Sequence, residues 1–204
     1  MIKILQVRNV DSFVESRRQK TSEKDRKTVQ SILNDVRKNG DSAVKKYERK
    51  FNGRKTSQLR VSAKEIREAE SKITKEQWTV LSPISSRLRS NEDYLKECLP
   101  MDVKKWDAMP VKSFVPIPSV GCYVPGGQAR YPSSAIMSVV PAKVAGVKRI
   151  VVVSPPGRDG KIDPLTIAAA KKFGATEIYK AGGAQAIGAL AYGTKSIPKV
   201  DKIV

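Results

Sequence analysis

The sequence predicts an α/β protein in which a helical lead, residues 1–120, precedes a parallel sheet, residues 121–204. The lead is dense in charge and holds only two of the chain's 13 glycines, Gly40 and Gly53. The second part is rich in glycine and carries four short apolar stretches that are separated by segments of helical pattern. Strand–helix–strand repetition of this kind forms parallel sheets with right-handed crossovers. We therefore expect helices first and a parallel sheet after them.

Four amphipathic helices are expected in the lead, because apolar residues recur there at helical spacing. Ser22 with Asp25, and Ser62 with Glu65, have the spacing of a capping box at a helix start. Pro83 falls inside the last helical pattern, where a proline should start, break or kink the helix. The four expected helices follow Ser22, Gly40, Ser62 and Thr74.

Four short strands and three helices are expected in the second part, in the order βαβαβαβ of a Rossmann-like sheet. Ser133 or Ser134 is expected to cap the first of these helices, and Asp163 with Pro164 marks the start of the next. The chain stops within its last apolar stretch, at Val204, so we expect the sheet to be truncated. The expected strands are residues 121–124, 149–153, 177–180 and 201–204, and the expected helices are 135–145, 164–173 and 184–192.

The chain is strongly basic, with 39 Lys and Arg against 20 Asp and Glu and a net charge of +19. Such a charge makes nucleic acid a candidate partner. The basic residues are spread over both parts of the chain, however, and aromatic residues make up only 6% of it. A nucleic-acid-binding module would gather arginine and aromatic side chains on one element. Solvated helix faces therefore explain the charge better, and a basic nucleic-acid-binding module is the less favoured alternative.

Composition also bears on where the protein acts. The sequence holds no run of about 18 apolar residues, so we expect no membrane-spanning helix. Charged residues come too early at the N-terminus for a secretory signal. The two cysteines, Cys98 and Cys122, are too few for a disulfide framework and fit a reducing compartment. These observations predict a cytoplasmic protein.

The chain contains no histidine. This excludes a Ser-His-Asp triad, a Cys-His pair, an imidazole general base and any histidine-ligated zinc within these residues. Acid–base chemistry in an enzyme of this sequence would need lysine, tyrosine or carboxylates, or residues from elsewhere. We therefore assign neither a catalytic residue nor a metal ligand to this chain.

Three glycine-containing loops follow the expected strands, at residues 125–134, 155–160 and 181–185. In a parallel α/β sheet, ligands bind beyond the carboxyl ends of the strands. Paired glycines let the main chain approach a ligand closely, and a helix N-terminus offers free N–H groups to phosphate. None of these loops has the dinucleotide fingerprint or a Walker sequence, so tight βα turns explain the glycines equally well.

The second part holds several uncommon motifs in a fixed order. They are GCYVPGG at 121–127, YPSS at 131–134, PAKVAGV at 141–147, GGAQAI at 182–187, ALAYGT at 189–194 and IPKVDKIV at 197–204. Taken in this order, they resemble histidinol dehydrogenase. The resemblance is dense over residues 121–204 and looser over residues 1–120, where it rests on helix pattern and order.

The resemblance implies the N-terminal half of a zinc-dependent, homodimeric enzyme that oxidises L-histidinol to L-histidine with two hydride transfers to NAD. It implies that Tyr123 of the YVPGG motif and Gln185 of the GGAQA motif contact NAD. A third contact, the asparagine of a Gly-Pro-Gly-Asn motif, would follow Val204. The catalytic Glu-His pair and the zinc ligands of the family would also lie beyond these residues. The chain alone is therefore expected to be inactive.

Some alternatives stay open on the sequence. A related NAD-dependent dehydrogenase of another small alcohol would share these motifs, and a separately encoded second half would complete the chain as well as a continuous one. Ser133 has two interpretations, as a ligand contact or as a helix cap. Cys122 stands where the family usually has an aliphatic residue, so we expect a small buried hydrophobe. We assign Arg130 no role.

Overall fold

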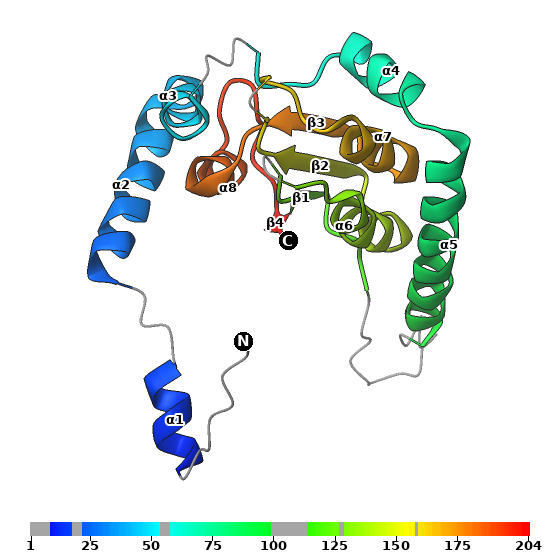
Figure 1. Ribbon diagram of the computed structural model, residues 1–204, viewed down its shortest axis with the longest axis horizontal. Helices are drawn as coiled ribbons and strands as arrows, with labels where there is room; N and C mark the ends of the chain where they lie inside the picture. The colour runs from blue at the N-terminus through cyan, green and yellow to red at the C-terminus, as the bar shows by residue number, and fades with distance from the viewer. Residues whose placement is uncertain (1–8, 18–21, 54–57, 99–113, 127–128, 158) are drawn as a thin grey trace, which may run out of the picture.

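The computed structural model describes residues 9–17, 22–53, 58–98, 114–126, 129–157 and 159–204. It confirms the α/β fold, with helices leading into a parallel sheet (Figure 1). The strands are β1 (Ser119–Tyr123), β2 (Arg149–Ser154), β3 (Glu177–Lys180) and β4 (Lys202–Ile203). Their order in the sheet is β3-β2-β1-β4, and every pair is parallel.

Eight helices accompany these strands in the described part of the chain. Five precede the sheet and three connect its strands, so the order of elements agrees with the expected βαβαβαβ unit. The helices are α1 (Val10–Arg17), α2 (Glu23–Asn39), α3 (Asp41–Asn52), α4 (Ala63–Ser71), α5 (Lys75–Glu97), α6 (Pro132–Val144), α7 (Pro164–Phe173) and α8 (Gly183–Tyr192).

The two faces of the sheet bury alternate residues of each strand, as strand geometry requires. Cys122 and Val152 point to the face covered by α6 and α7. Val151 and Val153 point to the opposite face, where they pack with α8, α2 and α3. Helix α5 lies outside α6 and α7, where Leu81 joins a third apolar cluster (Figure 1). The helical lead therefore contributes an outer layer on both sides of the sheet.

The expected helix starts are largely confirmed. Ser62 and Glu65 form a complete capping box at α4, and Ser22 accepts a hydrogen bond from the main chain of Asp25 at α2. Thr74 forms a second complete box with Gln77 at α5. These side chains accept main-chain N–H groups that the first turn of a helix leaves unpaired.

Pro83 neither starts nor breaks a helix, because α5 continues through it. A proline inside a helix costs about 3 kcal/mol, since one hydrogen bond is lost and the ring crowds the preceding turn. Apolar contacts on both sides of Pro83 offset this cost. Leu81 is buried against α6, Trp78 lies edge-on to Phe173 of α7 at a ring separation of 6.4 Å, and Leu88 packs on the same cluster.

One expected helix cap is wrong, and one helix of the structure was not expected. Helix α6 begins at Pro132, so Ser133 and Ser134 lie within its first turn and do not cap it. Proline suits the first helical position because its φ angle is already helical and its missing N–H needs no partner there. Helix α1 was not expected, because its apolar residues Val10 and Val14 stay exposed and mark no buried face.

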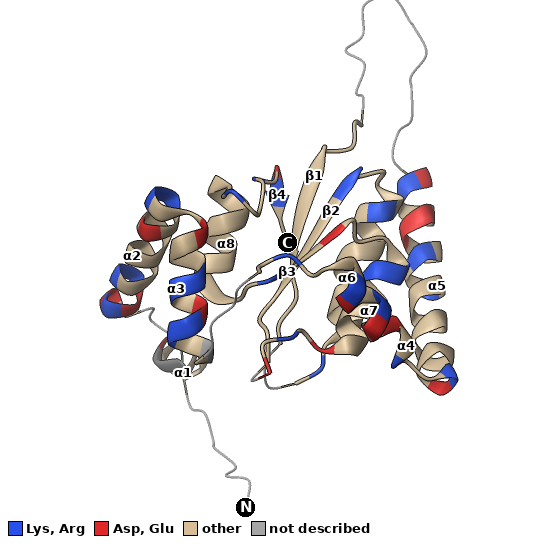
Figure 2. Cartoon of the chain, turned by 90° about the horizontal axis from the view of Figure 1, so that it is seen from above, with Lys and Arg blue, Asp and Glu red and all other residues tan. Residues whose placement is uncertain are grey.

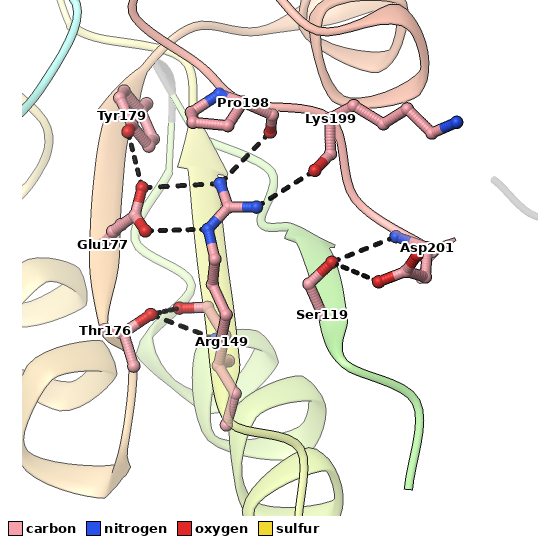
Figure 3. A network of polar contacts seen from close by, with 9 residues as sticks. Ser119, Arg149, Thr176, Glu177, Tyr179, Pro198, Lys199 and Asp201 are labelled. Carbon is pink, nitrogen blue, oxygen red and sulfur yellow. Dashed lines mark hydrogen bonds and ion pairs between the residues drawn. The ribbon is translucent and has the colours of Figure 1, made fainter.

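A polar network joins the amino-terminal ends of the strands (Figure 3). Arg149, at the start of β2, pairs through Nε with Oε1 of Glu177 at the start of β3, at 2.8 Å. Its Nη1 and Nη2 donate to the carbonyl oxygens of Lys199 and Pro198, at 3.0 and 3.1 Å. One guanidinium therefore ties the central strands to the segment that enters β4.

The two cysteines differ sharply in environment, and Cys122 is the small buried residue that the sequence predicts. Burial raises the pKa of its thiol to about 12, whereas Cys98 is exposed. Because only the thiolate reacts with DTNB, native protein at pH 8 is expected to release one thionitrobenzoate per chain, and denatured protein two. Cys98→Ser should abolish the native reaction and Cys122→Ser should leave it unchanged. Two rapid native equivalents would contradict the burial of Cys122.

Candidate functional site

Tyr123 and the turn between β3 and α8 meet at the carboxyl end of the sheet. Tyr123 ends β1 and is half-buried, and Gly182 and Gly183 lead from β3 into α8. The main-chain N–H of Gly183 donates to the Tyr123 hydroxyl at 3.1 Å. This bond uses the phenol oxygen as an acceptor, so the phenol hydrogen is left to donate elsewhere. The sequence-predicted site residue Tyr123 therefore faces the glycine turn of the third loop.

Gln185 lies beneath this turn, in the first turn of α8. Its side chain is 1% exposed, and its Nε2 donates to Oε1 of Glu48 at 2.8 Å. The same Glu48 oxygen accepts the main-chain N–H of Gly182, also at 2.8 Å. Gln185 is thus brought close to Tyr123 through the glycine turn, but its amide is covered.

The second amide atom, Oε1 of Gln185, is buried without a hydrogen-bond partner among the residues that the structure describes. An unsatisfied buried acceptor costs about 1–3 kcal/mol. A donor from a bound molecule would recover that cost. This oxygen is therefore a candidate acceptor for a donor group of a bound molecule at the carboxyl end of the sheet.

The turn itself needs both of its glycines. A Cβ on Gly182 would lie 2.5 Å from Cβ of Pro155, in the loop after β2. Gly183 has a φ of +56°, where residues with side chains are strained. The main chain therefore passes close to the neighbouring loop, which draws the second and third loops together.

Glu48 is a site residue that the sequence analysis missed. It is fully buried and lies on α3, in the helical lead, far along the chain from Gln185. One signal was present, since Glu48 follows the buried residue Val44 by four positions and so belongs to the apolar face of α3. A charged side chain at such a position needs polar partners, and two of them, Gly182 and Gln185, lie at the start of α8.

The remaining loop residues make contacts with the surrounding fold. Lys180, at the end of β3, is buried and pairs with Glu65 of the α4 capping box at 2.8 Å. Arg130 lies 3.2 Å from Asp163 at the start of α7. Ser133 is exposed on α6. Part of the first loop, Gly127 and Gln128, lies outside the described residues.

Among the described residues, neither the distribution of charged side chains nor the arrangement of possible metal ligands marks a second functional site. Lys and Arg are interspersed with Asp and Glu along α2, α3 and α5 (Figure 2). In the described ranges, no group of three or more His, Cys, Asp or Glu side chains is placed to hold a metal ion. Over the same residues, no helix has the length and apolar character needed to cross a membrane.

Comparison with known proteins assigns the chain to a family. The sequence model of histidinol dehydrogenase matches residues 15–204. The chain belongs to the histidinol dehydrogenase family. The match extends through most of the helical lead, including α2 to α5, as well as through the sheet.

Individual relatives agree with this assignment. The chain is 44% identical over 182 residues to histidinol dehydrogenase from Bacillus licheniformis. This match covers 89% of this chain and 43% of that protein. It is 46% identical over 178 residues to the one from Dehalococcoides mccartyi strain 195, covering 87% and 40%. The crystal structure of histidinol dehydrogenase from Elizabethkingia anophelis superposes with a TM-score of 0.80 at 28% identity, covering 96% and 46%. The chain thus spans less than half the length of these relatives.

Proposed function

We propose that this chain forms the NAD-binding part of a histidinol dehydrogenase, an enzyme that oxidises L-histidinol to L-histidine in histidine biosynthesis. The observation that carries the proposal is the pairing of Tyr123 with the Gly182-Gly183 turn above Gln185, within a chain of this family. NAD, when bound, accepts the hydride that leaves the alcohol carbon. The residues of this chain bind and orient it.

Two groups at the carboxyl end of the sheet fit a dinucleotide. The Tyr123 hydroxyl is held by the N–H of Gly183 and keeps its own hydrogen to donate, which suits a phosphate or ribose oxygen. Gln185 Oε1 is an unpaired acceptor, which suits a hydroxyl or amide N–H. This oxygen lies beside Gly183, since a Cβ built on that glycine would come within 2.9 Å of it.

The rest of the proposed enzyme is supplied by residues that this chain does not contain. With no histidine in the sequence, the proposed zinc site and Glu-His pair belong to other residues of the enzyme. A homodimer acting in the cytoplasm is the proposed working form. The free thiols of Cys98 and Cys122 are in keeping with a reducing compartment.

Replacing Tyr123 tests the cofactor site. Tyr123→Ala is expected to weaken NAD binding by the purified chain about tenfold, since one hydrogen bond and ring contact are lost. Tyr123→Phe should lose only the part due to the hydroxyl. Binding is measured by NMR titration with NAD, followed by the main-chain amide signals of Gly182 and Gly183.

Tyr94→Ala is the matched control, because Tyr94 is exposed on α5, away from the carboxyl end of the sheet. It should bind NAD as the unchanged chain does. Equal NAD affinities for Tyr123→Ala and Tyr94→Ala would remove Tyr123 from the site.

A further inference from the structure

Glu48 connects the helical lead to the candidate cofactor site. It is fully buried on α3, and its Oε1 accepts two hydrogen bonds of 2.8 Å, from the main chain of Gly182 and from Nε2 of Gln185. Both donors belong to the start of α8. One carboxyl oxygen thus contacts the cap residue of α8 and the side chain that lies below it.

These two bonds determine which way the Gln185 amide faces. The N–H of Gly182 can only donate, so the Glu48 oxygen that receives it must act as an acceptor. Gln185 can pair with that acceptor only through its NH2 group, which turns its Oε1 to the other side. The reversed amide would place two acceptors against each other. Glu48 therefore pairs with the NH2 group of Gln185 and leaves Oε1 as the unpaired acceptor on the other side of the amide.

Glu48 also changes what the start of α8 can bind. The N-terminus of a helix carries partial positive charge and commonly binds phosphate through its N–H groups. Here a carboxyl oxygen of the protein already accepts the N–H of Gly182. A phosphate placed at the same turn would approach both this carboxyl group and the unpaired Oε1 of Gln185, neither of which donates a hydrogen bond. The Gln185 side of the turn is therefore poorly suited to the pyrophosphate of a dinucleotide.

We infer that Glu48 is a positioning residue that holds Gln185 as a hydrogen-bond acceptor, so that the group received there is a ribose hydroxyl or an amide N–H and not a phosphate. The inference deepens the proposed function and rests on it for the identity of the ligand. Glu48 acts through Gln185 and the Gly182 turn, and it does not itself touch the ligand. Because Glu48 lies on the buried face of α3, its carboxyl group reaches the start of α8.

The orientation of Gln185 can be tested without any ligand, by NMR of the labelled 204-residue chain. The side-chain NH2 protons of Gln185 should show nuclear Overhauser contacts to the Glu48 side chain and slow exchange with water. Glu48→Gln keeps a carbonyl acceptor, so it should preserve these signals. Glu48→Leu removes the acceptor and should release them. Glu70→Gln is the control, because Glu70 is exposed on α4 and its replacement removes the same carboxylate charge as Glu48→Gln. It should have no effect on these signals.

The ligand class is tested with NAD, adenosine, nicotinamide riboside and inorganic pyrophosphate as separate probes. NAD and at least one nucleoside should shift the Gln185 side-chain signals, and pyrophosphate should leave them in place. Glu48→Leu should weaken NAD binding about tenfold, and Glu48→Gln should weaken it less than about threefold. In the double variant Glu48→Leu with Gln185→Leu, affinity should equal that of Gln185→Leu alone, because both changes act on one contact.

Each result decides between the alternatives. A shift of the Gln185 signals by pyrophosphate, or additive losses in the double variant, would overturn the inference. Missing contacts between Gln185 and Glu48 in the unchanged chain would also overturn it, even if Glu48→Leu fails to fold. If NAD shifts no signal at all, the proposed function fails, while the contacts in the unchanged chain still decide the role of Glu48.

Discussion

Purified chain mixed with L-histidinol, NAD and zinc is expected to form no NADH above the rate of a sample without protein. Oxidation of an alcohol by NAD needs a base that takes the hydroxyl proton as the hydride leaves. The proposed enzyme also needs zinc to orient its substrate. The chain has no histidine for either task, and its described carboxylates form no cluster that could hold a metal.

The measurement is NADH absorbance over time, with the full-length enzyme from Bacillus licheniformis as the positive control. The chain should be expressed in a host that lacks its own histidinol dehydrogenase, so that contaminating enzyme contributes nothing. Turnover that rises in proportion to the chain and survives repurification would show that the catalytic groups lie within these 204 residues. Tyr and Lys side chains at the carboxyl end of the sheet would then be the first to replace.

The parts of the fold that were predictable are those where local chemistry and burial agree. The strands could be found because their residues alternate between two buried faces, and Asp163 with Pro164 marked the start of α7 as expected. A helix follows Gly40 as expected, and this residue separates α2 from α3 with a positive φ of 53°. At each of these positions, no distant contact opposes the local preference.

Contacts distant in sequence decided what the sequence left open or missed. Of the three outcomes expected at Pro83, a start and a break do not occur, and α5 continues through it with α6 and α7 packed on residues to either side. Glu48 was overlooked for a similar reason, since its role depends on hydrogen bonds to Gly182 and Gln185, which are distant in sequence. Tyr123 and Gln185 were singled out by family resemblance, and their NAD contacts stay a prediction.

Arg149→Met is expected to destabilise the chain by about 2–3 kcal/mol, more than the removal of an exposed charge such as that of Arg89. Removing one partner of a well-buried ion pair costs about 3–5 kcal/mol, and here the side chains of Arg149 and Glu177 are 25% and 16% exposed, so the effect is smaller. The carbonyl oxygens of Pro198 and Lys199 lose their donor in the same variant. For a chain of this size the melting temperature should fall by about 5–10 °C.

The effect of Arg149→Met should depend on pH in a defined direction. Burial raises the pKa of Glu177, but hydrogen bonds from Arg149 and Tyr179 and the charge of Arg149 outweigh it, so the pKa lies below 4.5. A carboxyl group with a lowered pKa in the folded state stabilises it above the unfolded pKa and loses this effect as pH falls through the folded value. The difference between the two proteins should therefore be full at pH 7 and shrink below about pH 4.5.

Thermal unfolding of both proteins, followed by circular dichroism from pH 7 down to about pH 3, measures this difference. Arg89→Met is the matched control, because Arg89 is exposed on α5 and lies 3.8 Å from Asp93 in a surface pair. Such pairs contribute about 0–1 kcal/mol, so the control should melt close to the unchanged chain. Equal melting temperatures for Arg149→Met and Arg89→Met would show that the Arg149 network does not hold the strands. A difference that stays constant down to pH 3 would show instead that Arg149 acts through Pro198 and Lys199 and not through the charge of Glu177.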